Sequence, residues 1–233
     1  MTRRWDGWSA TAVSSGLACA VLYVGAALTV VGLPDTGAAG GEVARYVHDH
    51  RTLLLGGTYL WGLAITANIV FATAVWGVLG RADGPAAAAN LAGLFGALAL
   101  TVLEFGAFVV LATLAFRDAL EAAMARTLAD IFAITLDYTG FPSALWTGGA
   151  SITMLAGRRY RPWLAWLGFA SAGLHLVVAG AYASSGFFSP SGPLGLVEPV
   201  LITGWLGAFA VAIAADCDAR LPRLLRVITL RSL

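Results

Sequence analysis

The chain has 233 residues, of which 59% are hydrophobic and 12% are charged, and its mean hydropathy is +0.80. A soluble domain carries about 25% charged residues, so this composition excludes an ordinary soluble protein and favours a membrane protein. The formal net charge of +1 gives no basis for nucleic-acid binding, and all 14 basic residues are arginine, which excludes catalysis through a lysine.

Six apolar stretches are long enough to cross a bilayer, for which a helix needs about 20 residues. The first is too long for the apolar core of a cleaved signal peptide, so we interpret it as a retained span. The sequence therefore predicts an all-α fold in which residues 1–233 form one polytopic transmembrane domain, a bundle of six helices. The predicted spans are 10–33, 53–79, 86–116, 128–155, 162–184 and 195–215, and residues 216–233 form a basic cytoplasmic tail.

Arginine is divided unevenly between the two sets of connections. Ten arginines flank the first and last spans or lie in the connections at 80–85 and 157–162, and four lie on the other side. Because cytoplasmic loops are enriched in arginine, we expect both termini in the cytoplasm and the chain in the cell membrane. The outer segments 41–51 and 118–130 are amphipathic, which predicts short surface helices there.

Two carboxyl groups lie within the predicted spans. Glu104 is central in the third span, and Asp137 lies at about the same depth in the fourth. A carboxyl group inside a bilayer costs several kcal/mol unless it is neutral, paired or facing a cavity, so it is a candidate functional group. We predict that both are catalytic. The alternative is that each is a structural lock, hydrogen-bonded to a neighbouring helix.

His175 is the third candidate catalytic residue, because it lies midway along the fifth predicted span. The alternative is a satisfied histidine in the core. Pro142 follows Asp137 closely, and a proline inside a helix removes a backbone hydrogen bond, so we predict a kink over residues 137–142. Broken backbone at membrane depth is tolerated inside protein or beside a cavity.

Further polar and aromatic side chains lie within the predicted spans and are candidate substrate contacts. Aromatic residues in membrane helices also serve as interface anchors or as core filling, and a glutamate in the first turn of a helix can be solvated, so those alternatives stay open. The predicted substrate-binding residues are Asn68, Trp61, Tyr138, Phe141, Trp146, Tyr182, Glu198 and Trp205.

We expect no metal and no cofactor. His48 and His50 have a metal-like spacing, but no third histidine or cysteine is near them in the sequence, and Cys19 and Cys217 lie near opposite ends of the chain. The chain has no phosphate-binding glycine loop, no aspartate-rich diphosphate motif and no paired helical histidines for haem. Magnesium-dependent ionisation of a diphosphate is therefore not expected.

Four segments resemble a widespread family of bacterial six-helix membrane proteins of unknown function. They are residues 43–51, 56–60, 140–144 and 161–168. The resemblance extends over most of the chain and implies the six-span topology without implying an activity. It also suggests that the positions of Glu104 and Asp137 are usually apolar in that family, in which case this chain has acquired a site.

Three functions fit the buried acids. In the first, a carboxyl group removed from water keeps its proton at neutral pH and protonates an alkene or epoxide, and aromatic faces stabilise the resulting cation. In size, helical character and unpaired acids the chain resembles integral-membrane, protonation-initiated terpene cyclases, which implies a cyclase or isomerase of isoprenoids. The alternatives are a proton-coupled carrier or binder of a small hydrophobic molecule, and a scaffold without catalysis. The expected partners are a lipophilic small molecule and membrane lipids.

Overall fold

The computed structural model describes residues 7–80, 84–158, 160–180, 186–188 and 193–231, without the side chains of residues 194–196 and 218–231. Within these ranges the chain is all-α, as expected, and it forms eight helices, two more than the six predicted spans. They are α1 (Gly7–Ala27), α2 (Gly40–Asp49), α3 (Arg51–Leu79), α4 (Pro85–Phe116), α5 (Ala122–Tyr138), α6 (Gly140–Gly157), α7 (Pro162–Val178) and α8 (Pro193–Arg231).

Two features account for the additional helices. The amphipathic outer segment forms α2, and Val43 and Val47 bury its apolar face. The predicted fourth span is divided at Thr139 into α5 and α6. Both the backbone nitrogen and the hydroxyl group of Thr139 donate to the Leu136 carbonyl, at 3.0 and 2.5 Å, which closes α5. Pro142 then lies in the first turn of α6, where a proline disturbs no helical hydrogen bond.

Among the described residues, four helices are long and apolar enough to cross a membrane: α1, α3, α4 and residues Val197–Cys217 of α8. With 29 and 32 residues, α3 and α4 are about 44 and 48 Å long, which exceeds a hydrocarbon core of about 30 Å. α7 is also apolar but has only 17 residues. The chain is therefore a helical bundle with several candidate spans.

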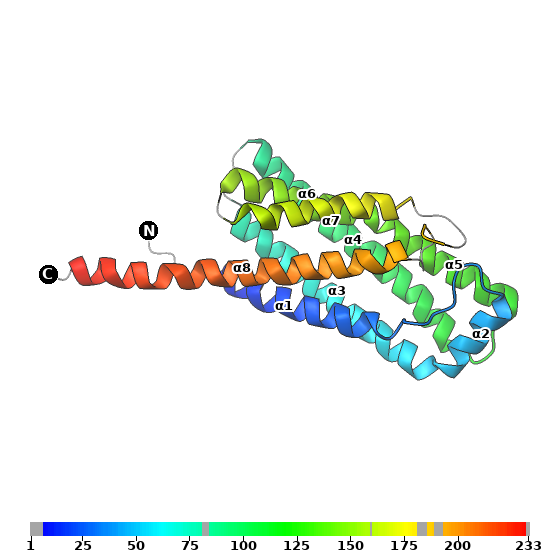
Figure 1. Cartoon of the computed structure of the whole chain (residues 1–233). Helices are drawn as coiled ribbons and strands as arrows, with labels where there is room; N and C mark the ends of the chain where they lie inside the picture. Colours follow the sequence, from blue (N-terminus) through cyan, green and yellow to red (C-terminus); the bar gives the residue numbers. More distant parts are fainter. Residues whose placement is uncertain (1–6, 81–83, 159, 181–185, 189–192, 232–233) are drawn as a thin grey trace.

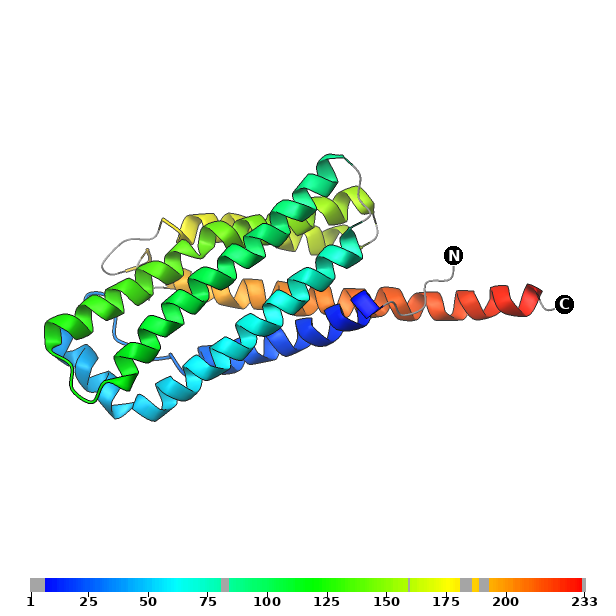
Figure 2. The same ribbon diagram turned by 180° about the vertical axis from the view of Figure 1, so that it is seen from behind.

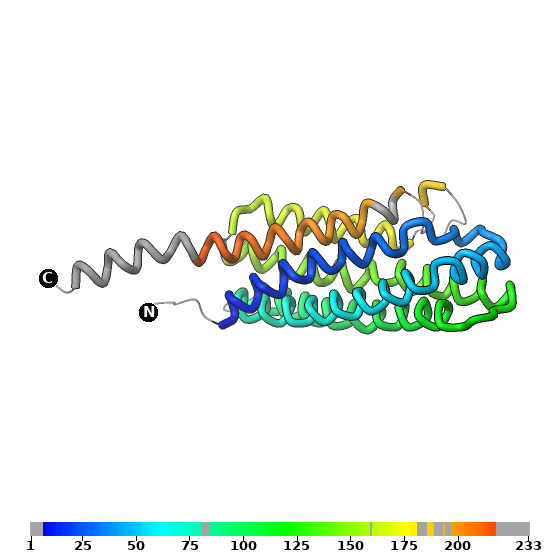
Figure 3. The backbone as a smooth tube through the Cα atoms, turned by 90° about the horizontal axis from the view of Figure 1, so that it is seen from below, coloured from blue at the N-terminus to red at the C-terminus, as the bar shows by residue number. Residues whose placement is uncertain are grey.

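Six helices form a closed ring. Going round it, α1 contacts α3, α3 contacts α4, α4 contacts α6, α6 contacts α7, α7 contacts α8, and α8 returns to α1 (Figures 1 and 2). In Figure 3 the blue α1 runs between α8 and α3, in agreement with these contacts. We call the end where α1 and α7 begin the proximal end, and the end where α8 begins the distal end. α2 and α5 contact each other at the distal end.

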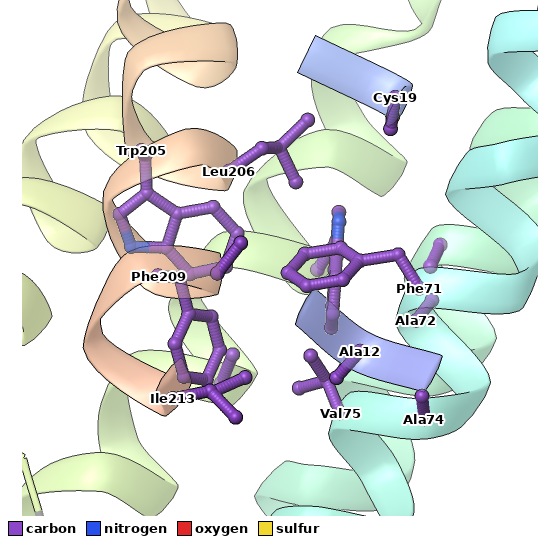
Figure 4. Close-up of a cluster of buried hydrophobic side chains, with 14 of the residues drawn as sticks. Ala12, Cys19, Phe71, Ala72, Ala74, Val75, Trp205, Leu206, Phe209 and Ile213 are labelled. Carbon is purple, nitrogen blue, oxygen red and sulfur yellow. The ribbon is translucent and has the colours of Figure 1, made fainter. Parts of the chain in front are cut away.

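Aromatic side chains fill the centre of the ring. Phe71 of α3 faces Trp205 and Phe209 of α8 (Figure 4). The ring centroids of Phe71 and Phe209 are 6.0 Å apart, in an edge-to-face arrangement that aromatic pairs prefer. Gly16 of α1 permits this packing, because a Cβ atom there would lie 2.7 Å from the Phe71 ring. Small residues at helix contacts are typical of membrane bundles.

Candidate functional site

Glu104 lies inside the ring and has a partner from across it. Its side chain is 8% exposed, and the Tyr23 hydroxyl donates to its two carboxyl oxygens, at 3.0 and 2.8 Å. Tyr23 belongs to α1 and Glu104 to α4, and these two helices are separated in the ring by α3. The hydrogen bond therefore crosses the interior.

Aromatic rings line one side of this pair. The Tyr23 ring meets the edge of Trp61 at a centroid distance of 5.2 Å, and Trp61 stacks on Phe108 at 4.3 Å. Phe108 continues to Phe132 of α5 at 5.6 Å. Phe108 is four residues after Glu104, so the two side chains share a face of α4. Aromatic faces next to an acid provide a region in which a cationic centre is stabilised.

His175 is completely buried and contacts Glu198. Its Nδ1 atom donates to the Ser171 carbonyl at 2.6 Å, and its Nε2 atom lies 2.7 Å from Glu198 Oε1. This second contact has the distance of an ion pair, but the N–H direction does not meet that of a hydrogen bond. Glu198 lies near the start of α8 at the distal end, and its side chain is 19% exposed.

Asp137 is the last-but-one residue of α5 and is 5% exposed. Its Oδ2 atom has no hydrogen-bond partner within the described part of the chain. The start of α6 also lies against His175, because a Cβ atom on Gly140 would collide with the His175 carbonyl oxygen.

Three predicted substrate contacts are buried in the interior of the ring. Asn68 of α3, Trp146 of α6 and Trp205 of α8 are all buried, and the Trp146 and Trp205 rings are 5.6 Å apart. Asn68 Oδ1 and the indole nitrogens of Trp61, Trp146 and Trp205 find no hydrogen-bond partner among the residues that the structure describes. Buried polar atoms in folded proteins normally have a partner, so these four atoms are exceptions among the described residues.

The other predicted residues lie elsewhere. Tyr138 and Phe141 flank the helix break and are half-exposed, with their rings 5.9 Å apart, so the structure does not bring them into the interior. Tyr182 lies outside the described residues. His50 stacks on Tyr46 at 4.2 Å at the distal end. Within the described ranges no group of three potential metal ligands occurs.

Sequence reasoning did not identify Tyr23, Phe108 or Phe132. Tyr23 is near the end of α1, where an aromatic residue usually indicates an interface anchor. Its contact with Glu104 depends on how α1 crosses α4, which no local pattern encodes. Phe108 offered a weak signal, because its spacing of four from Glu104 places it on the same helical face.

Comparisons of the chain with protein-family models, with curated proteins and with solved structures found no match. The functional argument therefore depends on the chemistry of the site. A buried carboxyl group that accepts from a phenol, beside stacked aromatic rings, can hold and donate a proton away from water. The other ionisable groups are Asp137, whose Oδ2 atom has no hydrogen-bond partner within the described residues, and the contacting pair of His175 and Glu198.

Proposed function

We propose that this protein is an integral membrane enzyme that acts on a lipophilic isoprenoid by acid catalysis, in the manner of protonation-initiated cyclases. One observation carries the proposal: the buried Glu104 carboxyl group accepts from Tyr23, the Tyr23 ring contacts Trp61, and Trp61 stacks on Phe108. An acid catalyst and a cation-stabilising surface are the two parts that such a reaction needs.

The reaction follows from these parts. The Glu104 carboxyl group transfers its proton to a terminal carbon–carbon double bond, which leaves a glutamate and a tertiary carbocation. The π electrons of the next double bond attack that carbocation and close a ring. Loss of a proton from a neighbouring carbon to a carboxylate ends the sequence. Because one proton is taken up and one is released, no oxidant or co-reactant is required, and the product is an isomer of the substrate.

The position of the site agrees with a substrate that enters from the lipid. Glu104 is twelve residues before the end of α4, at about 18 Å from its distal end, so it lies within the bilayer when α4 crosses it. We propose six crossings, made by the six helices of the ring, with α5 and α6 acting as one interrupted crossing. The proximal end then faces the cytoplasm, as the arginine distribution predicts.

This topology predicts the outcome of cysteine labelling. In a chain with Cys217→Ser, a cysteine at Arg158 should react with an impermeant thiol reagent only from the cytoplasmic side. A cysteine at Glu42 should react only from the opposite side, because the two positions are exposed at opposite ends of the bundle. Labelling of both positions from the same side would contradict the proposed orientation.

The enzymatic proposal is tested by incubating membranes that contain the protein with a panel of linear isoprenoids of increasing length. We expect a cyclic isomer, identified by mass spectrometry and chromatography, that membranes lacking the protein do not form. The specific alternative is a proton-coupled carrier, which the histidine–glutamate contact favours. A carrier would accumulate the unchanged compound in vesicles when a proton gradient is applied.

Replacing Tyr23 separates positioning from proton donation. Tyr23→Phe removes the hydroxyl group that binds Glu104 and keeps the ring that contacts Trp61. We expect turnover to fall by about tenfold or less, because the hydrogen bond is worth about 0.5–1.5 kcal/mol and the transferable proton remains on Glu104. Initial rates of product formation measure this effect, and a complete loss of activity would make Tyr23 itself the donor.

A further inference from the structure

A groove lies between α1 and α3 near the proximal end, where the two helices run side by side (Figures 2 and 3). Its volume is about 470 Å³, within the range of about 300–1,000 Å³ that is usual for small-molecule sites. Trp8 and Thr11 of α1 line one wall, and Val70 and Thr73 of α3 line the other. Because Trp8, Thr11 and Val70 are exposed, the groove is open towards the outside of the ring.

The walls of the groove suit an apolar ligand. A Cβ atom on Gly77 would lie 2.6 Å from the Trp8 ring, so the indole lies directly against the backbone of α3. Across from α1, the Thr73 hydroxyl donates to the Ile69 carbonyl of its own helix at 2.8 Å. The donor of Thr73 is therefore occupied, and the indole ring and the Val70 side chain offer apolar surface.

The depth of the groove indicates which part of a lipid it meets. Thr73 and Ile69 are six and ten residues before the end of α3, at about 9 and 15 Å from it. A centred helix of about 44 Å exceeds a hydrocarbon core of about 30 Å by about 7 Å at each end. The groove then lies in the hydrocarbon of the leaflet at the proximal end, directly below its headgroups.

The proximal end carries an excess of positive charge. The segments that precede, join or follow the helices there contain ten arginines and four aspartates, a net charge of +6; they are residues 1–6, 80–84, 158–161 and 216–233. Arg4 is three residues before Gly7, which lines the groove, and Arg81 is two residues after the end of α3. Clustered arginine attracts anionic lipid headgroups.

We infer that the groove between α1 and α3 binds one acyl chain of an anionic phospholipid, whose headgroup lies at the arginine-rich proximal surface. The apolar walls and the depth select the chain, and the net charge selects the headgroup. A shaped groove retains its lipid, whereas a flat lipid-facing surface exchanges lipids without preference. This site lies outside the ring and goes beyond the proposed function, because it involves neither Glu104 nor its partners.

Photolabelling of the unaltered full-length protein provides the test. The probe is phosphatidylglycerol with a photoreactive diazirine on one acyl chain, as a minor component of phosphatidylcholine vesicles, and the labelled residues are identified by mass spectrometry. We expect about fivefold or more label on residues 69–74 relative to Leu91 and Phe95. These two residues of α4 are exposed at the same distances from the proximal end, so they control for depth. Even labelling of the two helices would overturn the inference.

The headgroup is tested with a phosphatidylcholine probe that carries the same photoreactive chain. We expect about fivefold or less of the label on residues 69–74 that the phosphatidylglycerol probe gives, which corresponds to the attraction of about one basic residue. Equal labelling by the two probes would show that charge plays no part and would overturn the choice of an anionic lipid.

A matched pair of variants tests the groove itself. Thr73→Trp should fill it, and Thr66→Trp is the control, because Thr66 is exposed on the same helix without lining the groove. Each hydroxyl donates at 2.8 Å to the carbonyl four residues earlier, so both substitutions remove the same kind of hydrogen bond. Native mass spectrometry of the purified proteins should show about fivefold or less retained phosphatidylglycerol for Thr73→Trp alone. Undiminished retention in folded Thr73→Trp would overturn the inference, and if that variant does not fold, the photolabelling decides.

A second copy of the chain seated in the groove gives a different result. Residues 69–74 would then be shielded from the probe, and light scattering would show a dimer that Thr73→Trp dissociates. That outcome would overturn the lipid site. A monomer with label concentrated on residues 69–74 supports it.

Discussion

Glu104→Gln should lower the rate of product formation by about 10²-fold or more while the protein still folds. Glutamine has nearly the same size as glutamic acid, and its amide oxygen can still accept from the Tyr23 hydroxyl group. It has no proton that it can transfer to an alkene. Positioned acid catalysis contributes about 10²–10⁴-fold, so its removal should be visible in initial rates.

Two controls make this result interpretable. Glu42→Gln removes an exposed acid at the distal end and should leave the rate unchanged. The thermal midpoint of Glu104→Gln, measured on the purified protein in detergent, should stay within a few degrees of that of the unaltered protein. An active Glu104→Gln protein would reject the donor role. A variant that fails to fold would instead identify Glu104 and Tyr23 as a structural contact between α1 and α4.

Gly149→Ala should destabilise the bundle, and Gly148→Ala should be tolerated. A Cβ atom on Gly149 would lie 2.8 Å from the Gly93 nitrogen and would collide with the Ala89 carbonyl, so α4 and α6 would have to separate. A Cβ atom on Gly148 would meet only Ala172, at 3.7 Å. Backbone atoms cannot move aside as a flexible side chain can.

Such overpacking costs about 1–3 kcal/mol, whereas alanine in place of an unhindered helical glycine gains up to about 1 kcal/mol. The fraction of protein that stays monodisperse after heating is measured by size-exclusion chromatography. Relative to the unaltered protein, this fraction should be lower for Gly149→Ala and unchanged for Gly148→Ala. Equal stability of the two variants would show that α4 and α6 do not pack as closely as the structure has them.

The helices whose ends are marked by local residues, such as a glycine or a proline, could be predicted from the sequence. The expected spans 53–79 and 86–116 correspond to α3 (Arg51–Leu79) and α4 (Pro85–Phe116). α4 begins after Gly84, which adopts a φ of +61°, and has Pro85 in its first turn, two features that fix a helix start locally. The apolar length of such segments is set by the bilayer, so composition alone indicates them.

The structural consequences of the break in the fourth predicted span could not be predicted from the sequence. Pro142 predicts a kink, but its presence does not determine the angle between the helical segments before and after it. The break at Thr139 leaves Asp137 buried and turns Tyr138 and Phe141 towards the outside. Both residues were predicted as substrate contacts, and that role stays a prediction, because their side chains are about half exposed on either side of the helix break.

The candidate site was predictable residue by residue but not as a set of contacts. Isolated polar groups in apolar helices indicate positions that need burial, and the structure buries Glu104, Asp137 and His175. Their catalytic roles stay predictions. The partners Tyr23 and Glu198 depend on the closure of the ring through α1 and α8, and tertiary contacts of this kind leave no local pattern in the sequence.

The central claim is that Glu104 delivers a proton to a carbon atom of the substrate. The most direct measurement is the mass and label position of the product formed in D2O by membranes that contain the protein. The account predicts one solvent-derived deuterium at the carbon of the terminal double bond that is protonated, and loss of this labelled product in Glu104→Gln. A cyclic product without deuterium, or a labelled product at an undiminished rate from Glu104→Gln, would contradict it.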